Sequence, residues 1–333
     1  MSPGGTQWLL AGIMLLVGIA GLSLGNMEIG PFTVMKILLS RIAPISPTWP
    51  QTLDSVIMDV RLPRVAAGLL VGAGLSISGA SFQGVFRNPL VSPHILGVAA
   101  GAGFGAAMAI LLFDHIVLIQ LLAFVGGLLA VGLTYLISRY QKMTPILMLV
   151  LSGIVVGALF SALTSFVKYI ADPMNRMPAI VFWLLGSLNH VSNEDLVIVA
   201  PVFVICMALL LSVRWRINLL AMGDEDARAL GVNTERLKAL IIICATTLTA
   251  ASVCISGIIG WIGIVIPHIG RMLVGPDHKQ LLPTSMLIGA AYLTAVDLLA
   301  RSLLVTEIPI GILTAIIGAP IFVYLLRKSR TGE

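Results

Sequence analysis

The chain has 333 residues, of which 58% are hydrophobic and only 11% are charged. A soluble globular domain carries roughly 25% charged residues, so this sequence has too few polar side chains to cover a soluble protein of its length. The net charge of +5 does not indicate a nucleic-acid partner, because the basic residues are scattered among loops and form no stripe or basic helix. The composition favours a chain that crosses a membrane several times.

Each crossing of a bilayer needs about 20 consecutive apolar residues. We therefore expect an all-α, polytopic membrane protein, with one transmembrane domain over residues 1–333 and about ten spans. The first span is expected to be retained, because no basic start precedes it and no small-residue cleavage site follows it. The expected spans are 8–25, 62–84, 92–112, 115–137, 145–169, 193–213, 238–257, 258–274, 284–304 and 310–326.

The three cysteines, Cys206, Cys244 and Cys254, all lie within apolar runs. They show no Cys-x-x-Cys pattern and no paired His spacing, so we interpret them as small buried hydrophobic residues. The sequence predicts no disulfide, no structural metal and no cofactor.

The positions of Lys and Arg predict the orientation in the membrane. With the amino terminus in the cytoplasm and ten alternating spans, most of the 20 Lys and Arg residues fall on the cytoplasmic side. The even number of spans returns the basic carboxy-terminal tail to the same side. We therefore expect both termini in the cytoplasm.

A short pattern occurs twice along the chain. Residues 77–79 read Ile-Ser-Gly and are followed by Pro93-His94, and residues 255–257 read the same and are followed by Pro267-His268. The two spans run in opposite directions in the expected topology, as in the inverted repeats of many transporters. The pattern is a weak signal of an inverted internal repeat, and chance similarity explains it equally well.

The longest polar stretch expected inside the cell is 214–238, and its residues are typical of a helix, a stop and a second helix. Acidic residues at 224–226 suit a helix amino terminus, and Gly231 suits a carboxy-terminal stop. Asn233 can then cap the next helix. The pattern favours a short helix parallel to the membrane that presents Ala229 and Leu230, and the alternative is an ordinary connecting loop.

Four polar residues fall inside or near the ends of expected spans. His268 and Arg271 have no second His or carboxylate at ligand spacing, so we favour hydrogen bonding within a broken helix over a proton or metal site. Asp297 and Arg301 are four residues apart, a spacing that allows an ion pair on one helical face. Because charges within a span are costly, such a pair explains them without catalysis.

No enzyme motif is present in the sequence. There is no His-Glu-x-x-His pattern, no Gly-x-Ser-x-Gly pattern in a strand–turn–helix setting and no Walker A loop. We expect that the chain is not an enzyme, and that any ATP-driven transport would need a separate ATPase subunit.

Three long segments carry a family resemblance. Arg61 to Gly103, Gly257 to Pro283 and Glu307 to Lys328 closely resemble the FecCD-type permeases, the membrane subunits of importers for ferric siderophores, haem and cobalamin. The similarity covers nearly the whole chain in the family's order. It implies ten helices per subunit in the bacterial inner membrane and a homodimer with the path at its two-fold interface. It also implies two copies of a cytoplasmic ATPase and one periplasmic binding protein as partners, besides membrane lipid.

The resemblance also implies roles for particular residues. Arginines on the outer face of family members meet carboxylates of the binding protein, and Arg61, Arg64 and Arg301 match those positions. Met143 and Thr144 match the cytoplasmic gate of the family. In relatives the path is lined largely by the fifth and tenth helices. The ATPase-docking helix corresponds to Asp224, Glu225, Asp226, Ala227, Arg228, Ala229, Leu230 and Gly231.

The expected function is import of an iron chelate, such as a ferric siderophore or haem, by alternating access driven by a partner ATPase. The same architecture also serves cobalamin and molybdate or tungstate in relatives, so these cargoes stay open. An ion-coupled secondary transporter is the alternative from another class, and Asp297 is the credible intramembrane carboxylate for it.

Overall fold

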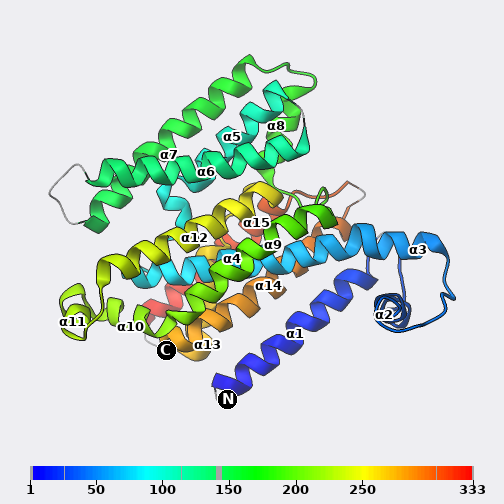
Figure 1. Cartoon of the computed structure of the whole chain (residues 1–333), viewed down its shortest axis with the longest axis horizontal. Helices are drawn as coiled ribbons and strands as arrows, with labels where there is room; N and C mark the ends of the chain where they lie inside the picture. Colours follow the sequence, from blue (N-terminus) through cyan, green and yellow to red (C-terminus); the bar gives the residue numbers. More distant parts are fainter. Residues whose placement is uncertain (1–2, 26, 114, 140–144, 305, 332–333) are drawn as a thin grey trace.

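The computed structural model describes residues 3–331 except 26, 114, 140–144 and 305, and every regular element in this part of the chain is helical (Figure 1). The elements are α1 (Pro3–Ser23), α2 (Pro31–Leu39), α3 (Gln51–Ser55), η1 (Val56–Arg61), α4 (Leu62–Phe86), η2 (Pro93–Leu96), α5 (Val98–Leu112), α6 (Ile116–Arg139), α7 (Pro145–Ile170), α8 (Arg176–Leu185), α9 (Asn193–Ser212), α10 (Arg214–Met222), α11 (Asp224–Ala229), α12 (Thr234–Ser256), α13 (Ile262–Val274), α14 (His278–Ser302) and α15 (Ile310–Thr331).

Seven helices in the described residues are long and apolar enough to cross a membrane. Four shorter apolar helices accompany them: α5, α8, α13 and α15. Each of the ten spans expected from the sequence coincides with a helix, and the all-α polytopic fold is confirmed. The sequence did not predict α2, α3 or α8. These helices have only 9, 5 and 10 residues, too few for the apolar length by which spans were recognised.

Helix α4 is the centre of the bundle. The span that contains it has 83% of its most apolar stretch buried, and α4 packs against α9, α12, α13 and α14. Glycines allow these close contacts: a Cβ on Gly72 would lie 2.2 Å from the carbonyl oxygen of Gly289 in α14. A Cβ on Gly79 would lie 2.0 Å from that of Gly263 in α13. The backbones therefore touch, as small residues permit in membrane helices.

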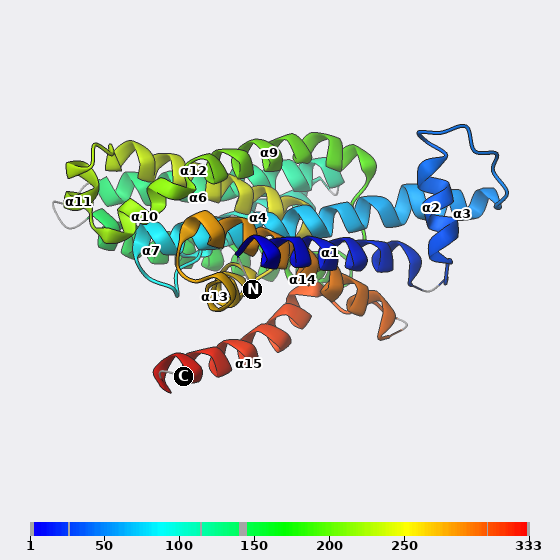
Figure 2. The same ribbon diagram turned by 90° about the horizontal axis from the view of Figure 1, so that it is seen from below.

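The remaining helices surround this core unequally. Helices α5, α6 and α7 pack on one another and form a layer beside the core, with α8 next to them (Figure 1). Helix α15 leans away from the bundle (Figure 2). Two ends can be named from the figures: the α11 end carries α10 and α11, and the α3 end carries α2 and α3. Helix α1 begins and α15 ends toward the α11 end (Figure 2), so these two ends of the chain lie on the same side.

The polar stretch 214–238 folds as helix, stop and helix. Helix α11 ends at Ala229, Gly231 adopts a φ of +81°, and the Asn233 side chain accepts a hydrogen bond from the Arg236 N–H at 3.0 Å. The expected stop and cap are thus present, and Ala229 and Leu230 are exposed as predicted. Helix α10 precedes them and was not predicted. The inverted repeat stays a prediction.

Candidate functional site

Arginine side chains close the carboxy-terminal end of α1 toward the α3 end of the bundle. Arg61 Nη1 donates hydrogen bonds to the carbonyl oxygens of Leu22 at 2.8 Å and Ser23 at 3.0 Å, and its Nη2 donates to that of Met27. Arg301 donates to the carbonyl oxygen of Gly21. The last carbonyls of a helix have no partner inside it, so these guanidinium groups satisfy the end of α1 and complement its negative pole.

Arg64 joins α4 to two carboxylates. Its Nε donates to both carboxylate oxygens of Asp297, at 2.9 and 3.0 Å. Its Nη1 and Nη2 donate to the two oxygens of Glu307, at 2.8 and 2.9 Å. A planar guanidinium matches carboxylates in this forked geometry, which a lysine cannot reproduce. Arg64 therefore fastens α14 and the segment before α15 to the central helix.

The predicted Asp297–Arg301 pair is present but secondary. Arg301 Nε lies 3.8 Å from an oxygen of Asp297, a longer contact than those made by Arg64. Sequence spacing identified the neighbour four residues away and missed Arg64, which lies 233 positions distant, and Glu307. We call Arg61, Arg64, Asp297, Arg301 and Glu307 the arginine cluster.

The arginine cluster is not an open cationic surface. Arg61, Arg64 and Arg301 are buried, with 5, 6 and 8% of their surfaces exposed, and each is held by a partner within the chain. Their expected contact with a binding protein stays a prediction, and in this structure the three guanidinium groups are held by partners within the chain. Within the cluster Glu307 is the more accessible group, with 38% of its side chain exposed.

At the α11 end, Asp224 ties the short helix to the bundle. It accepts a hydrogen bond from Arg87, after the end of α4, at 2.8 Å, and pairs with Lys238 of α12 at 2.5 Å. Partial burial acts to raise the pKa of Asp224, but the hydrogen bond from Lys238 and the charges of Lys238 and Arg87 outweigh it, and the pKa is lowered. Asp224 is thus an internal anchor, whereas Glu225, Asp226, Ala229 and Leu230 are exposed.

The polar residues of α13 form a structural contact. Arg271 donates to the Gln83 side chain of α4, and Gln83 donates to the carbonyl oxygen of Gly263 at 3.2 Å. His268 Nδ1 has no hydrogen-bond partner among the described residues. No group of three or more potential metal ligands occurs in the part of the chain that the structure describes.

Several helices show apolar faces that the chain itself does not cover, and α7 and α15 are among them. On α7 the large hydrophobic residues Ile154, Val155 and Leu159 are each more than half exposed, and on α15 so are Ile316 and Tyr324. The predicted gate residues Met143 and Thr144, just before α7, lie outside the described residues.

A cavity of about 630 Å³ opens between α6, α8, α12 and the start of α15. Its polar lining includes Gln120, His190 and Glu307, and its apolar lining includes Phe182 and Trp183. Because Glu307 is also a ligand of Arg64, this cavity borders the arginine cluster.

The described chain is a bundle of membrane helices packed through glycines, and it exposes the short helix α11 at one end. The sequence contains no nucleotide-binding motif. This combination is typical of the membrane subunit of a transporter. The chain belongs to the FecCD transport family, whose model matches residues 13–328. It is 42% identical to the molybdate import system permease protein MolB of Haemophilus influenzae, with 100% of this chain and 99% of that protein covered. It is 34% identical to the hemin transport system permease protein HmuU of Yersinia pestis, with 95% of each covered.

A solved structure shows the same fold. It is described as an inward-facing conformation of a metal-chelate type ABC transporter, and one of its chains is 41% identical to this one. The TM-score is 0.87, with 97% of this chain and 98% of that chain covered. The protein is therefore the permease subunit of an ABC importer and is not itself an enzyme, so ATP hydrolysis and substrate capture require an ATPase and a binding protein.

Proposed function

We propose that two copies of this chain form the permease of a bacterial inner-membrane importer, with two cytoplasmic ATPases and one periplasmic binding protein. The support for a second copy is membership of the FecCD family, together with the exposed apolar residues on α7 and α15. Both termini are assigned to the cytoplasm, because α1 begins and α15 ends on the side of the polar stretch 214–238, which carries five Lys or Arg residues (Figure 1).

Transport follows alternating access in this proposal. The loaded binding protein docks at the α3 end, and ATP-driven closure of the ATPases moves α11. Because Asp224 connects α11 to both Arg87 and Lys238, that motion is passed to α4 and α12. The permease subunits then shift against each other, and the path between them opens to one side at a time.

The cargo we propose first is an iron chelate. One observation supports it: between Ile146 and Val167, α7 carries no charged residue, and neither does α15 between Ile310 and Leu325. A wall of apolar and small side chains holds a bulky chelate weakly, which suits a conduit. Relatives include proteins named as iron chelatin permeases of Helicobacter pylori, 42% and 41% identical over 84% of this chain.

Molybdate is the second candidate. Its support is the relative named as a molybdate permease, which matches this chain from end to end at 42% identity. The uncharged faces of α7 and α15 offer no cation that would hold such an oxyanion within the path. A third possibility, cobalamin, rests on a relative of Halobacterium salinarum at 43% identity over 86% of this chain.

Uptake into proteoliposomes that contain the permease, its ATPase and its binding protein tests the proposal. Labelled ferric siderophore, haem, cobalamin and molybdate are compared with and without ATP. ATP-dependent uptake of an iron chelate alone supports the first candidate, and uptake of molybdate alone replaces it with the second. Equal uptake with and without ATP would contradict ATP-driven import and favour an ion-coupled secondary transporter.

For the ATPase contact we propose the exposed side of α11, including Glu225, Ala229 and Leu230. For the outer contact, the buried arginines of the arginine cluster keep the α3 end in the shape that the binding protein meets. The arginine-to-carboxylate docking expected from the sequence would then need Arg61, Arg64 or Arg301 to leave its internal partners.

A further inference from the structure

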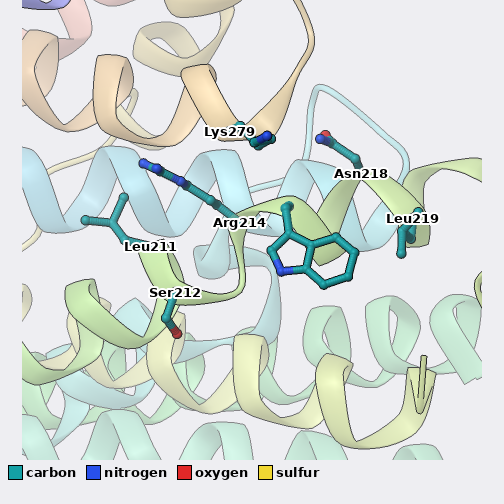
Figure 3. Close-up of a pocket in the computed structure, with 7 residues that line it drawn as sticks. Leu211, Ser212, Arg214, Asn218, Leu219 and Lys279 are labelled. Atoms are coloured by element: carbon teal, nitrogen blue, oxygen red, sulfur yellow. The ribbon is translucent and has the colours of Figure 1, made fainter. Parts of the chain in front are cut away.

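A pocket lies where α9 gives way to α10, beside the first turn of α14 (Figure 3). Its volume is about 620 Å³. The close-up shows Arg214 and Lys279 approaching the pocket from different helices, with Asn218 beside Lys279 (Figure 3). The pocket is lined by Leu211, Ser212, Arg214, Trp215, Asn218, Leu219 and Lys279.

The pocket has a fixed polar frame on one side. The Asn218 side chain donates to Asp277 at 2.6 Å and accepts from the His278 backbone N–H at 2.9 Å, and this joins α10 to the start of α14. Asp277 also accepts from the Lys279 N–H at 2.9 Å. The nearest carboxylate is therefore occupied by the frame, and it does not line the pocket.

The charge of the lining is positive, and Asp277, whose charge interacts with that of Lys279, lies outside the lining. Arg214 and Lys279 line the pocket, and neither side chain makes a hydrogen bond or ion pair with another described residue. No Asp or Glu contributes to the lining. Two cations in one cavity favour a ligand with a phosphate or another anionic group.

The position of the pocket relative to the membrane identifies the source of that group. Helix α9 is of spanning length, yet only 22% of its most apolar stretch is buried, so most of it faces lipid. Val204, Ile205 and Leu209 are exposed along the turns that lead to the pocket. Trp215, 47% exposed, lies at the junction, where amphipathic aromatic rings mark the membrane–water boundary. Acyl chains along α9 would bring a headgroup to the two cations.

We propose that this pocket binds the headgroup of an anionic phospholipid from the leaflet at the α11 end. The phosphate lies between Arg214 and Lys279, and the acyl chains lie against α9. The lipid then links α9, α10 and α14 immediately beside the short helix α11. The proposal depends on the membrane-spanning fold and is independent of the cargo.

Native mass spectrometry of the full-length permease tests it, with equal amounts of phosphatidylglycerol and phosphatidylcholine in the detergent. The protein should retain phosphatidylglycerol selectively. The double variant Arg214→Gln/Lys279→Gln should weaken that binding by at least about tenfold. Arg236→Gln, an exposed arginine at the same end but outside the pocket, should leave it unchanged.

Three results would overturn the proposal. The first is equal phosphatidylglycerol binding by the double variant and the Arg236→Gln control. The second is displacement of the lipid by millimolar inorganic phosphate, which would indicate a site for a free anion. The third is loss of ATPase binding in the double variant with lipid retention unchanged, which would assign the pocket to the ATPase. If the double variant does not fold, Arg214→Lys and Lys279→Arg should retain the lipid, and Arg214→Gln alone should lose part of it.

Discussion

At the scale of single residues, Arg64 forms ion pairs with two carboxylates, those of Asp297 and Glu307. Replacing it by Ala leaves Asp297, which is 1% exposed, as a buried carboxylate with Arg301 at 3.8 Å as its remaining partner. We expect Arg64→Ala to lower the free energy of unfolding by about 3–5 kcal/mol, measured by denaturation in detergent. The exposed Arg236→Ala should change it by less than about 0.5 kcal/mol.

Substitutions at Arg64 distinguish the contribution of the guanidinium geometry from the contribution of the positive charge. Arg64→Lys keeps the charge but loses the fork that reaches Asp297 and Glu307 together, so it should recover only part of the stability. Adding Asp297→Asn to Arg64→Ala should restore stability, because it removes the unpaired charge. If Arg64→Ala lowers the free energy of unfolding no more than the Arg236→Ala control does, the arginine cluster does not stabilise the fold.

Asp224 gives a residue-scale prediction with a pH dependence. Its folded pKa is lowered from 3.8, so its ion pairs stabilise the fold above that pH and lose their effect as the pH falls through the folded value. The groups are partly exposed, so we expect Asp224→Asn to cost below about 1 kcal/mol at pH 7. The difference in melting temperature between the two proteins should start to shrink as the pH falls below about 4 and should vanish once the pH is below the folded pKa. If the difference in melting temperature persists in acid, the ion pairs of Asp224 with Arg87 and Lys238 are not its cause.

At the scale of elements, helix contacts depend on where glycine meets a backbone. Gly79→Ala should lower stability by about 1–3 kcal/mol, because its Cβ would press on the Gly263 carbonyl of α13. Gly132→Ala in α6 is the matched control, since a Cβ there meets nothing within 4 Å. That control should be neutral or stabilising by up to about 1 kcal/mol, and melting temperatures of the two variants test the contrast.

Helix α11 provides the second element-scale prediction. Leu230 is 61% exposed at its end, so a negative charge there disturbs no packing within the chain. Leu230→Asp should weaken ATPase binding by at least about tenfold in a pull-down titration, because the new carboxylate would be buried in the contact without a partner. Met174→Asp, at an 85% exposed position outside α11, is the control and should bind normally. Equal binding by the two variants would remove α11 from the contact.

The elements also show how far sequence reasoning reaches. All ten long or medium helices could be predicted, because a bilayer requires an apolar length that hydropathy records directly. The stop at Gly231 and the cap at Asn233 could be predicted because their signals are local. The arginine cluster could not, since Arg64 and Asp297 are 233 positions apart and only the packing of α4 on α14 brings them together. Outside the expected spans, the sequence predicted the short helix α11 but did not predict α8 or α10.

At the scale of the whole molecule, the uncovered faces of α7 and α15 predict self-association. The native cysteines are buried, so a background with Cys206, Cys244 and Cys254 changed to Ala gives a clean host for crosslinking. In that background Ile316→Cys should form a dimer with a short bismaleimide. Ile205→Cys on the lipid-facing side of α9 should remain a monomer under the same conditions. Crosslinking of both variants to the same extent would indicate random collision.

The way α1 is secured has a consequence for biosynthesis. Only 11% of its most apolar stretch is buried, and it packs chiefly against α14. The carbonyl of Gly21 receives its hydrogen bond from Arg301, 280 positions later. This hydrogen bond to α1 can therefore form only after α14 has been inserted into the membrane. A chain truncated before α14 would lack both the Arg301 hydrogen bond and the helix against which α1 chiefly packs.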